Sequence, residues 1–151
     1  MNLSLRDMNA KRRAYTLLCW ALMVFAPFLL LGAVSLLIRK NAFFTYPVWT
    51  DELDYWRALF SWNAVGFRTG YTGLFEEFPK YGTLGAHGFT PILLYGWFVK
   101  LFGLSYNTVM ICNAVWVSLG GLAFCALEKP KPVTALFLTA FLTLYMPIVL
   151  Y

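Results

Sequence analysis

The chain has 151 residues, of which 60% are hydrophobic and only 13% are charged. Soluble globular domains carry about 25% charged residues, so this composition favours a membrane protein and argues against a soluble enzyme domain. The net charge of +5 is modest, and no basic stripe lies outside the flanks of the apolar segments. This distribution argues against nucleic acid as a partner and suits contact with the anionic headgroups of membrane lipid.

The first apolar segment, residues 14–38, runs for 25 residues without a charge and follows a basic N-terminus. A transmembrane helix needs about 20 apolar residues, so this segment is long enough to cross a bilayer. A signal peptide has an apolar core of only about 7–15 residues, followed by a cleavage site with small residues that is not apparent here. We therefore predict a first transmembrane helix, kinked at Pro27.

Two further apolar segments, residues 106–127 and 133–151, predict a second and a third transmembrane helix. The pair Gly120 and Gly121 in the second segment suits packing against other helices rather than against lipid. The sequence thus predicts an all-α integral membrane protein with a single membrane domain. Because the chain stops at the third segment, we expect a fragment of a larger polytopic protein whose missing helices pack against these.

A shorter apolar stretch, residues 91–103, either crosses the membrane or lies flat on it. Runs of about 10–14 apolar residues are more often interfacial. The flat arrangement places the lysine-bearing loop 128–132 on the same side as the basic N-terminus, as the positive-inside rule favours, whereas Arg39 and Lys40 fall outside in either arrangement. The favoured topology has a cytoplasmic N-terminus and an external loop at residues 39–105.

The external loop, residues 39–105, holds five of the seven acidic residues and the single histidine. Connectors in compact domains are much shorter, so we expect this loop to be folded. Thr50 is typical of a helix N-cap, with Asp51 and Glu52 in the first turn. Leucine and aromatic residues follow at helical spacing, which predicts an amphipathic interfacial helix near residues 50–63.

The acidic pair Asp51 and Glu52 has two interpretations. Carboxylates in the first turn of a helix complement its dipole and need no further role. Alternatively, a carboxylate held beside apolar surface at the interface is suited to act as a general base, because such surroundings raise its pKa. The sequence predicts no metal site made of protein ligands and no definite cofactor. The possibility that a divalent cation is bound between the two carboxylates is left open.

The loop also holds the cations that a phosphate group would use, Arg57, Arg68 and Lys80. Each of them, taken individually, is better explained as a solvated or snorkelling side chain. His87 stands among glycines and is either a bystander or a ligand-binding residue. The glycine-rich stretch 66–88 either brings backbone amides towards an anion or forms a tightly turned connector, since no standard phosphate-loop spacing is present.

An aromatic-flanked Asp-Glu pair that opens a surface helix after a first span resembles the start of the GT-C glycosyltransferases. The protein O-mannosyltransferases and the lipid A aminoarabinose transferases belong to that superfamily. The matching residues are Trp49, Asp51, Glu52 and Tyr55. Further on, HGFTPILLYGWFVKLFGLSYNTVMICNAVWVSLGGL resembles the second juxtamembrane helix and second span of the family.

The resemblance implies the N-terminal part of a transferase that takes sugar from a polyprenyl-phosphate donor, at the outer face of a membrane that we expect to be the bacterial plasma membrane. Asp51 matches the proposed catalytic base, which would deprotonate an acceptor hydroxyl for direct, inverting displacement, and Glu52 would orient it. The residues expected to bind the phosphate or the acceptor are Arg57, Arg68, Lys80 and His87. Family members are several times longer, so this chain alone need not be active.

Two other classes of function compete with transfer. A non-enzymatic membrane protein or subunit would use its aromatic loop to bind lipid or a protein partner, and would need neither Asp51 nor His87. A transporter would place ionisable residues within its spans. The predicted spans hold none, which counts against transport.

Overall fold

The computed structural model describes the backbone of residues 5–44, 50–68, 70–71, 80–81 and 88–144, and the side chains of residues 9–44, 52–68 and 88–143. The described part is helical apart from one pair of two-residue strands, so the predicted all-α class is confirmed at this level. The chain divides into two compact units: unit 1 comprises Met1–Ala42 and Asn113–Tyr151, and unit 2 comprises Phe43–Cys112.

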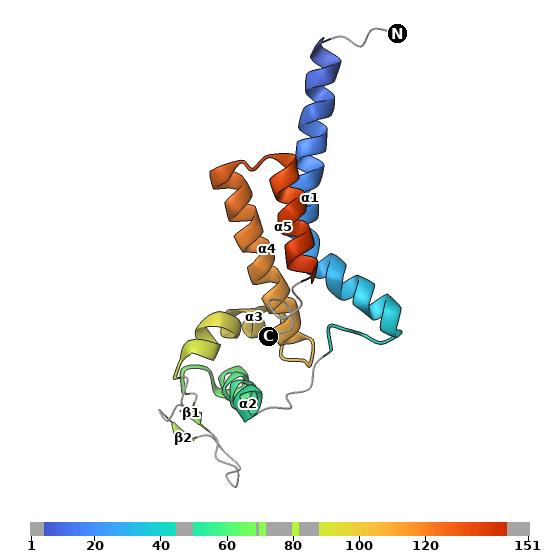
Figure 1. Ribbon diagram of the computed structural model, residues 1–151. Coiled ribbons are helices and arrows are strands. Elements are labelled where there is room, and N and C mark those ends of the chain that lie inside the picture. The colour runs from blue at the N-terminus through green and yellow to red at the C-terminus, as the bar shows by residue number, and fades with distance from the viewer. Residues whose placement is uncertain (1–4, 45–49, 69, 72–79, 82–87, 145–151) are drawn as a thin grey trace. The chain divides into compact units, whose positions relative to one another are not determined.

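Unit 1 contains helix α1 (Leu5–Ile38), most of helix α4 (Thr108–Glu128) and helix α5 (Pro132–Leu144) (Figure 1). By length and composition, two stretches are able to cross a membrane, Asn9–Ile38 within α1 and the whole of α4. They fall on the first two predicted spans. Helix α5 is apolar but has only 13 described residues, and the remainder of the third predicted span lies outside the described residues.

Helix α1 changes direction along its length. Its last part, drawn in light blue and cyan, runs at an angle to the blue part (Figure 1). Pro27 lies inside this helix and is buried. Proline lacks the backbone N–H for an intrahelical hydrogen bond, and its ring crowds the carbonyl one turn earlier. The observed bend therefore agrees with the kink predicted at Pro27.

Three of the four residues in the buried core cluster of unit 1 are small. Cys19 and Met23 of α1 are buried together with Cys125 of α4 and Ala135 of α5. Residues of this size let helices approach closely, which matters most where lipid provides no hydrophobic drive for helix association. The helices of unit 1 thus meet at small residues, and larger hydrophobic side chains pack around this contact as partly buried residues: Trp20, Val24, Phe124, Leu138 and Leu142.

Only one glycine of the predicted packing pair lies at a helix contact. A Cβ atom at Gly121 would lie 3.6 Å from the Cα of Val24 on α1, whereas a Cβ at Gly120 would meet nothing within 4 Å. The packing role is therefore confirmed for Gly121 and is not seen for Gly120. A side chain longer than alanine at position 121 would push against the α1 backbone.

Unit 2 is built on helix α2 (Thr50–Val65) and on a second helical segment that begins as the π-helical turn η2 (Ile92–Gly96) and continues as helix α3 (Trp97–Phe102). Between them lie the 3₁₀ turn η1 (Gly66–Arg68) and the antiparallel strand pair β1 (Gly70–Tyr71) and β2 (Lys80–Tyr81). The second segment ends at Gly103, whose φ of 82° favours glycine. Helices thus occur near residues 50–63 and 91–103, where the sequence predicts them.

We expect Gly121→Leu to destabilise unit 1 by about 1–3 kcal/mol, because the new side chain must displace the α1 backbone or leave its rotamer. The measurement is the apparent Tm of the detergent-solubilised protein, followed by fluorescence-detected size exclusion after heating. Gly120→Leu is the matched control and is expected to leave Tm nearly unchanged. Equal losses in the two variants would show that Gly121 holds no special place in the packing.

Candidate functional site

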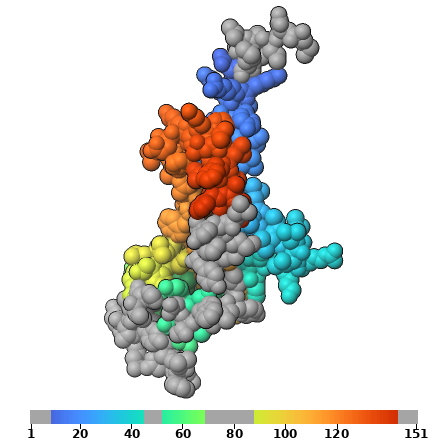
Figure 2. Space-filling view, in the orientation of Figure 1, coloured from blue at the N-terminus to red at the C-terminus, as the bar shows by residue number. Residues whose placement is uncertain are grey.

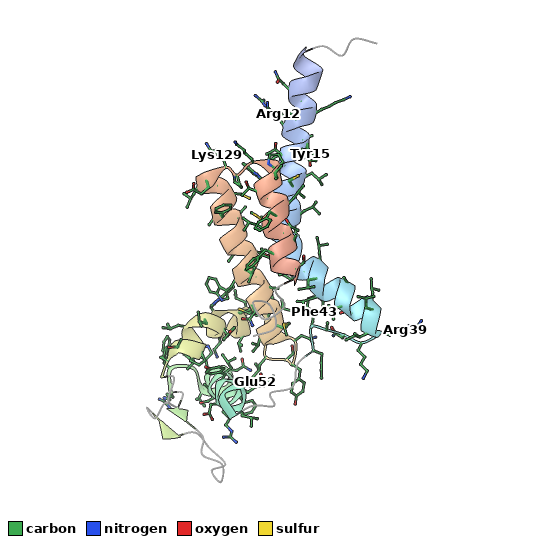
Figure 3. All side chains as sticks on the ribbon, viewed as in Figure 1. Arg12, Tyr15, Arg39, Phe43, Glu52 and Lys129 are labelled. Atoms are coloured by element: carbon green, nitrogen blue, oxygen red, sulfur yellow. The ribbon has the colours of Figure 1, made fainter. Side chains whose placement is uncertain are left out.

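Helix α2 begins at Thr50 and places the predicted acidic pair in its first turn. The backbone of Asp51 is helical, and its side chain lies outside the described residues. The side chain of Glu52 is half-buried on the same turn (Figure 3). The position of the pair at the start of a helix therefore agrees with the sequence analysis, and the first-turn location complements the helix dipole.

The predicted phosphate-binding cations occupy different elements. Arg57 is half-buried on α2, and its Nη1 atom lies 3.8 Å from Oδ1 of Asp54, one turn earlier on the same helix. Arg68 is exposed at the end of η1. The backbone of Lys80 lies on β2, but its side chain, like all of His87, lies outside the described residues. A phosphate group at Arg57 would have to share this guanidinium with Asp54.

Aromatic rings gather beside the turn that carries the acidic pair. The Tyr106 ring lies 5.1 Å from the Phe44 ring and 5.1 Å from the Trp56 ring, measured between centroids. Trp56 follows Glu52 by four residues, which places the two on neighbouring turns of one helix face. Three segments of unit 2 thus meet at the turn of α2 that follows the acidic pair.

Unit 2 is held together by the buried indole of Trp62. Its Nε1 atom donates a hydrogen bond of 3.0 Å to the carbonyl oxygen of Gly96 in η2. A Cβ atom at Gly96 would lie 2.9 Å from Nε1 and 3.0 Å from Cγ2 of Ile92, so the absence of a side chain at this position allows the close approach. We call this contact the Trp62–Gly96 contact.

Lys100 adds a second link between α2 and α3. Its Nζ atom donates a hydrogen bond of 3.0 Å to the carbonyl oxygen of Asn63 and lies 5.6 Å from the centroid of the Trp62 ring. A cation at this distance is attracted to the ring face. Lys100 therefore fixes the charged end of α3 to α2, a role that the sequence analysis did not assign.

The π-helical turn offers carbonyls to side-chain donors. The carbonyl oxygen of Leu94 accepts a hydrogen bond from Nε1 of Trp97 at 2.9 Å and from Sγ of Cys112 at 3.7 Å. Gly96 accepts its bond from Trp62 in the same turn. A π turn interrupts the regular bonding of an α-helix, which explains why indole and thiol donors are found here. A glycine at position 96 is the sequence feature of this turn from which a close contact could have been predicted.

In the part of the chain that the structure describes, no group of three or more His, Cys, Asp or Glu side chains is placed to hold a metal ion. No protein-family model, no curated protein and no solved structure matches the chain. The functional assignment consequently depends on the residues and on their placement.

We expect Trp62→Phe to lower the stability of unit 2 by about 1–3 kcal/mol, because it leaves the buried Gly96 carbonyl without its indole donor. The measurement is the rate of limited proteolysis between residues 63 and 91, compared with the wild type. Trp97→Phe is the matched control, since the hydrogen bond that the Trp97 indole donates to the Leu94 carbonyl lies within its own helical segment. Cleavage that is unchanged in Trp62→Phe would contradict the proposed importance of the contact.

Proposed function

We propose that this chain is the N-terminal part of a GT-C-type membrane glycosyltransferase, which transfers sugar from a polyprenyl-phosphate donor to an acceptor hydroxyl. One observation supports the proposal above others. The pair Asp51 and Glu52 opens a helix of a folded unit that stands in the chain between two helices able to cross a membrane. Segments that only connect two helices are usually short and do not form a folded unit of their own.

Unit 2 exposes an apolar helix face that suits the membrane interface. Leu93, Trp97 and Leu101 follow one another at intervals of four residues, and all three are exposed, Leu93 at 68% and Leu101 at 70%. The adjoining face, with Ile92 and Gly96, is buried. Such a helix needs an apolar environment on the side that the protein leaves uncovered.

The same helical segment is too short to cross a bilayer. Ile92–Phe102 has 11 residues, which extend about 16 Å as a helix, against a hydrocarbon core of about 30 Å. Together with the exposed face, this length supports the flat arrangement of residues 91–103. In the proposed architecture, both α2 and α3 are interfacial helices at the outer surface, and α5 begins a third span.

The basic residues of unit 1 support a cytoplasmic N-terminus. Trp20 of α1 donates a hydrogen bond of 2.9 Å from Nε1 to the carbonyl oxygen of Pro130. The loop with Lys129 and Lys131 therefore lies at the end of unit 1 that carries Arg12 (Figure 3). This end carries more positive charge than the other end of α1, where Arg39 and Lys40 lie, and the positive-inside rule favours the cytoplasm for the end that is richer in Lys and Arg. Unit 2 then lies on the outer side.

In the proposed reaction, Asp51 takes the proton from the acceptor hydroxyl as its oxygen attacks the anomeric carbon of the sugar. The new carbon–oxygen bond forms as the bond to the lipid phosphate breaks, and the configuration inverts. Glu52 orients Asp51. The charge on the departing phosphate is offset by one or more of the proposed binding residues Arg57, Arg68, Lys80 and His87.

A cysteine at Ala64, an exposed position on α2, is expected to react with a membrane-impermeant maleimide in intact cells or sealed right-side-out vesicles. A cysteine at Lys131 is expected to react only after permeabilisation. The native cysteines are all buried and give little background. The measurement is the mass shift of the labelled protein. Labelling of Ala64→Cys only after permeabilisation would place unit 2 in the cytoplasm and overturn the proposed site.

Asp51→Asn is expected to reduce sugar transfer from a labelled polyprenyl-phosphate donor by at least about 100-fold, because it removes the general base. The assay uses membranes containing the whole protein to which this chain belongs. Asp54→Asn, on the next turn of α2, is the matched control and is expected to keep most of the activity. Both variants should reach the membrane at wild-type levels. Full activity in Asp51→Asn would reject the assignment.

The exposed face of α3 also favours a second candidate, a non-catalytic membrane protein that binds lipid or a partner through this surface. Under this alternative, Asp51→Asn leaves function intact, whereas Leu101→Asn, which places a polar amide on the exposed face, abolishes binding. The same pair of variants therefore separates the two candidates. Loss of transfer in Asp51→Asn with retained membrane association supports the transferase.

A further inference from the structure

Helix α1 has an open pocket of about 510 Å³ near its N-terminal end. The residues that line it are Asn9, Arg12, Arg13, Thr16, Leu17 and Trp20. Their spacing of three, one, three, one and three residues places all six on one face of an α-helix. The transfer reaction proposed above uses none of them.

The lining changes from cationic to apolar along the helix. Arg12 and Arg13 are exposed, and within the described side chains neither guanidinium has an ion-pair partner. Thr16 donates its hydroxyl hydrogen to the carbonyl oxygen of Arg12 at 2.9 Å. Leu17 and Trp20 then continue the face with apolar surface, Leu17 being 61% exposed. The pocket thus offers two positive charges at one end and hydrocarbon contact at the other.

A second element brings further positive charge to this region. The hydrogen bond from Trp20 to Pro130 places the α4–α5 loop beside the pocket, and Lys129 and Lys131 of this loop are exposed. Glu128, the exposed last residue of α4, is the acidic side chain next to this loop. Figure 2 shows the N-terminal part of α1, in blue, extending beyond the ends of α4 and α5 in orange and red.

We propose that this pocket binds the headgroup of an anionic phospholipid. The phosphate lies between Arg12 and Arg13, whose guanidinium groups match phosphate geometry, and an acyl chain follows Leu17 and Trp20. The order of charge and then apolar surface along one face matches the order of headgroup and hydrocarbon in a phospholipid. A free phosphate ion has no apolar group that could contact the apolar half of the pocket. The proposal is independent of the transfer reaction.

The test is native mass spectrometry of the delipidated protein in detergent, titrated with dioleoyl phosphatidylglycerol or dioleoyl phosphatidylcholine. Wild type is expected to bind phosphatidylglycerol at least about tenfold more tightly than phosphatidylcholine, and Arg12→Gln/Arg13→Gln is expected to lose this preference. The charge-matched control is Arg39→Gln/Lys40→Gln, which removes the two cations that directly follow the C-terminal end of α1; Arg39 is labelled in Figure 3. The control is expected to bind like wild type.

Two outcomes would overturn the proposal. Equal weakening in the Arg12/Arg13 and Arg39/Lys40 variants would show that general surface charge attracts the lipid. Displacement of the lipid by equimolar glycerol phosphate or inorganic phosphate would show a site for free anions. Arg12→Lys/Arg13→Lys keeps the charge but not the guanidinium geometry, and is expected to bind phosphatidylglycerol more weakly than wild type and more tightly than Arg12→Gln/Arg13→Gln. Circular dichroism of each variant checks that α1 remains helical.

Discussion

The packing of unit 2 depends on the indole of Trp62, which links α2 to the segment formed by η2 and α3. An apolar helix as short as Ile92–Phe102 has too few residues to be stable by itself in water, so one of its faces needs a protein partner. Trp62 covers that face with a ring and satisfies the Gly96 carbonyl with its N–H group. Because a side chain at Gly96 would collide with the indole, the glycine and the tryptophan depend on each other.

The same contact explains why α2 and not a loop presents the acidic pair. Leu59 and Trp62 are buried one turn apart on α2, and their burial fixes the rotation of the helix about its axis. The rotation then determines which side chains of the first turn face the protein, and Glu52 is half-buried there. The chemistry proposed for Asp51 would thus depend on a packing contact three turns further along the helix.

Sequence patterns located the helices well because apolar runs and polar boundaries are local features. The π turn was not predictable, since it depends on the indole of Trp62 and the thiol of Cys112, two donors supplied by other segments. The contact of Lys100 was not predictable either, because its partner at Asn63 is a backbone carbonyl, which any residue would supply. The difference between Gly120 and Gly121 likewise depends on which side of α4 faces α1.

The site itself was predicted from residue type more than from geometry. Asp51 and Glu52 were recognised because a first-turn acidic pair beside aromatic residues is a local pattern, and their helical position agrees with it. The cations were chosen only for their charge. Sequence gave no sign that Arg57 would lie near Asp54, because each residue of an amphipathic helix has several possible partners at three or four positions away.

The two proposals place different lipid phosphates on opposite sides of one bilayer. If α1 and α4 both cross, the chain between them, which includes Asp51, lies across the membrane from Arg12 and Arg13. The pocket on α1 would then bind phospholipid of the cytoplasmic leaflet, whereas the polyprenyl-phosphate donor would be used at the outer face. A bound headgroup at the cytoplasmic end would neutralise Arg12 and Arg13 without competing for the donor. The two sites can therefore be occupied together, and the loss of either one leaves the chemistry of the other unchanged.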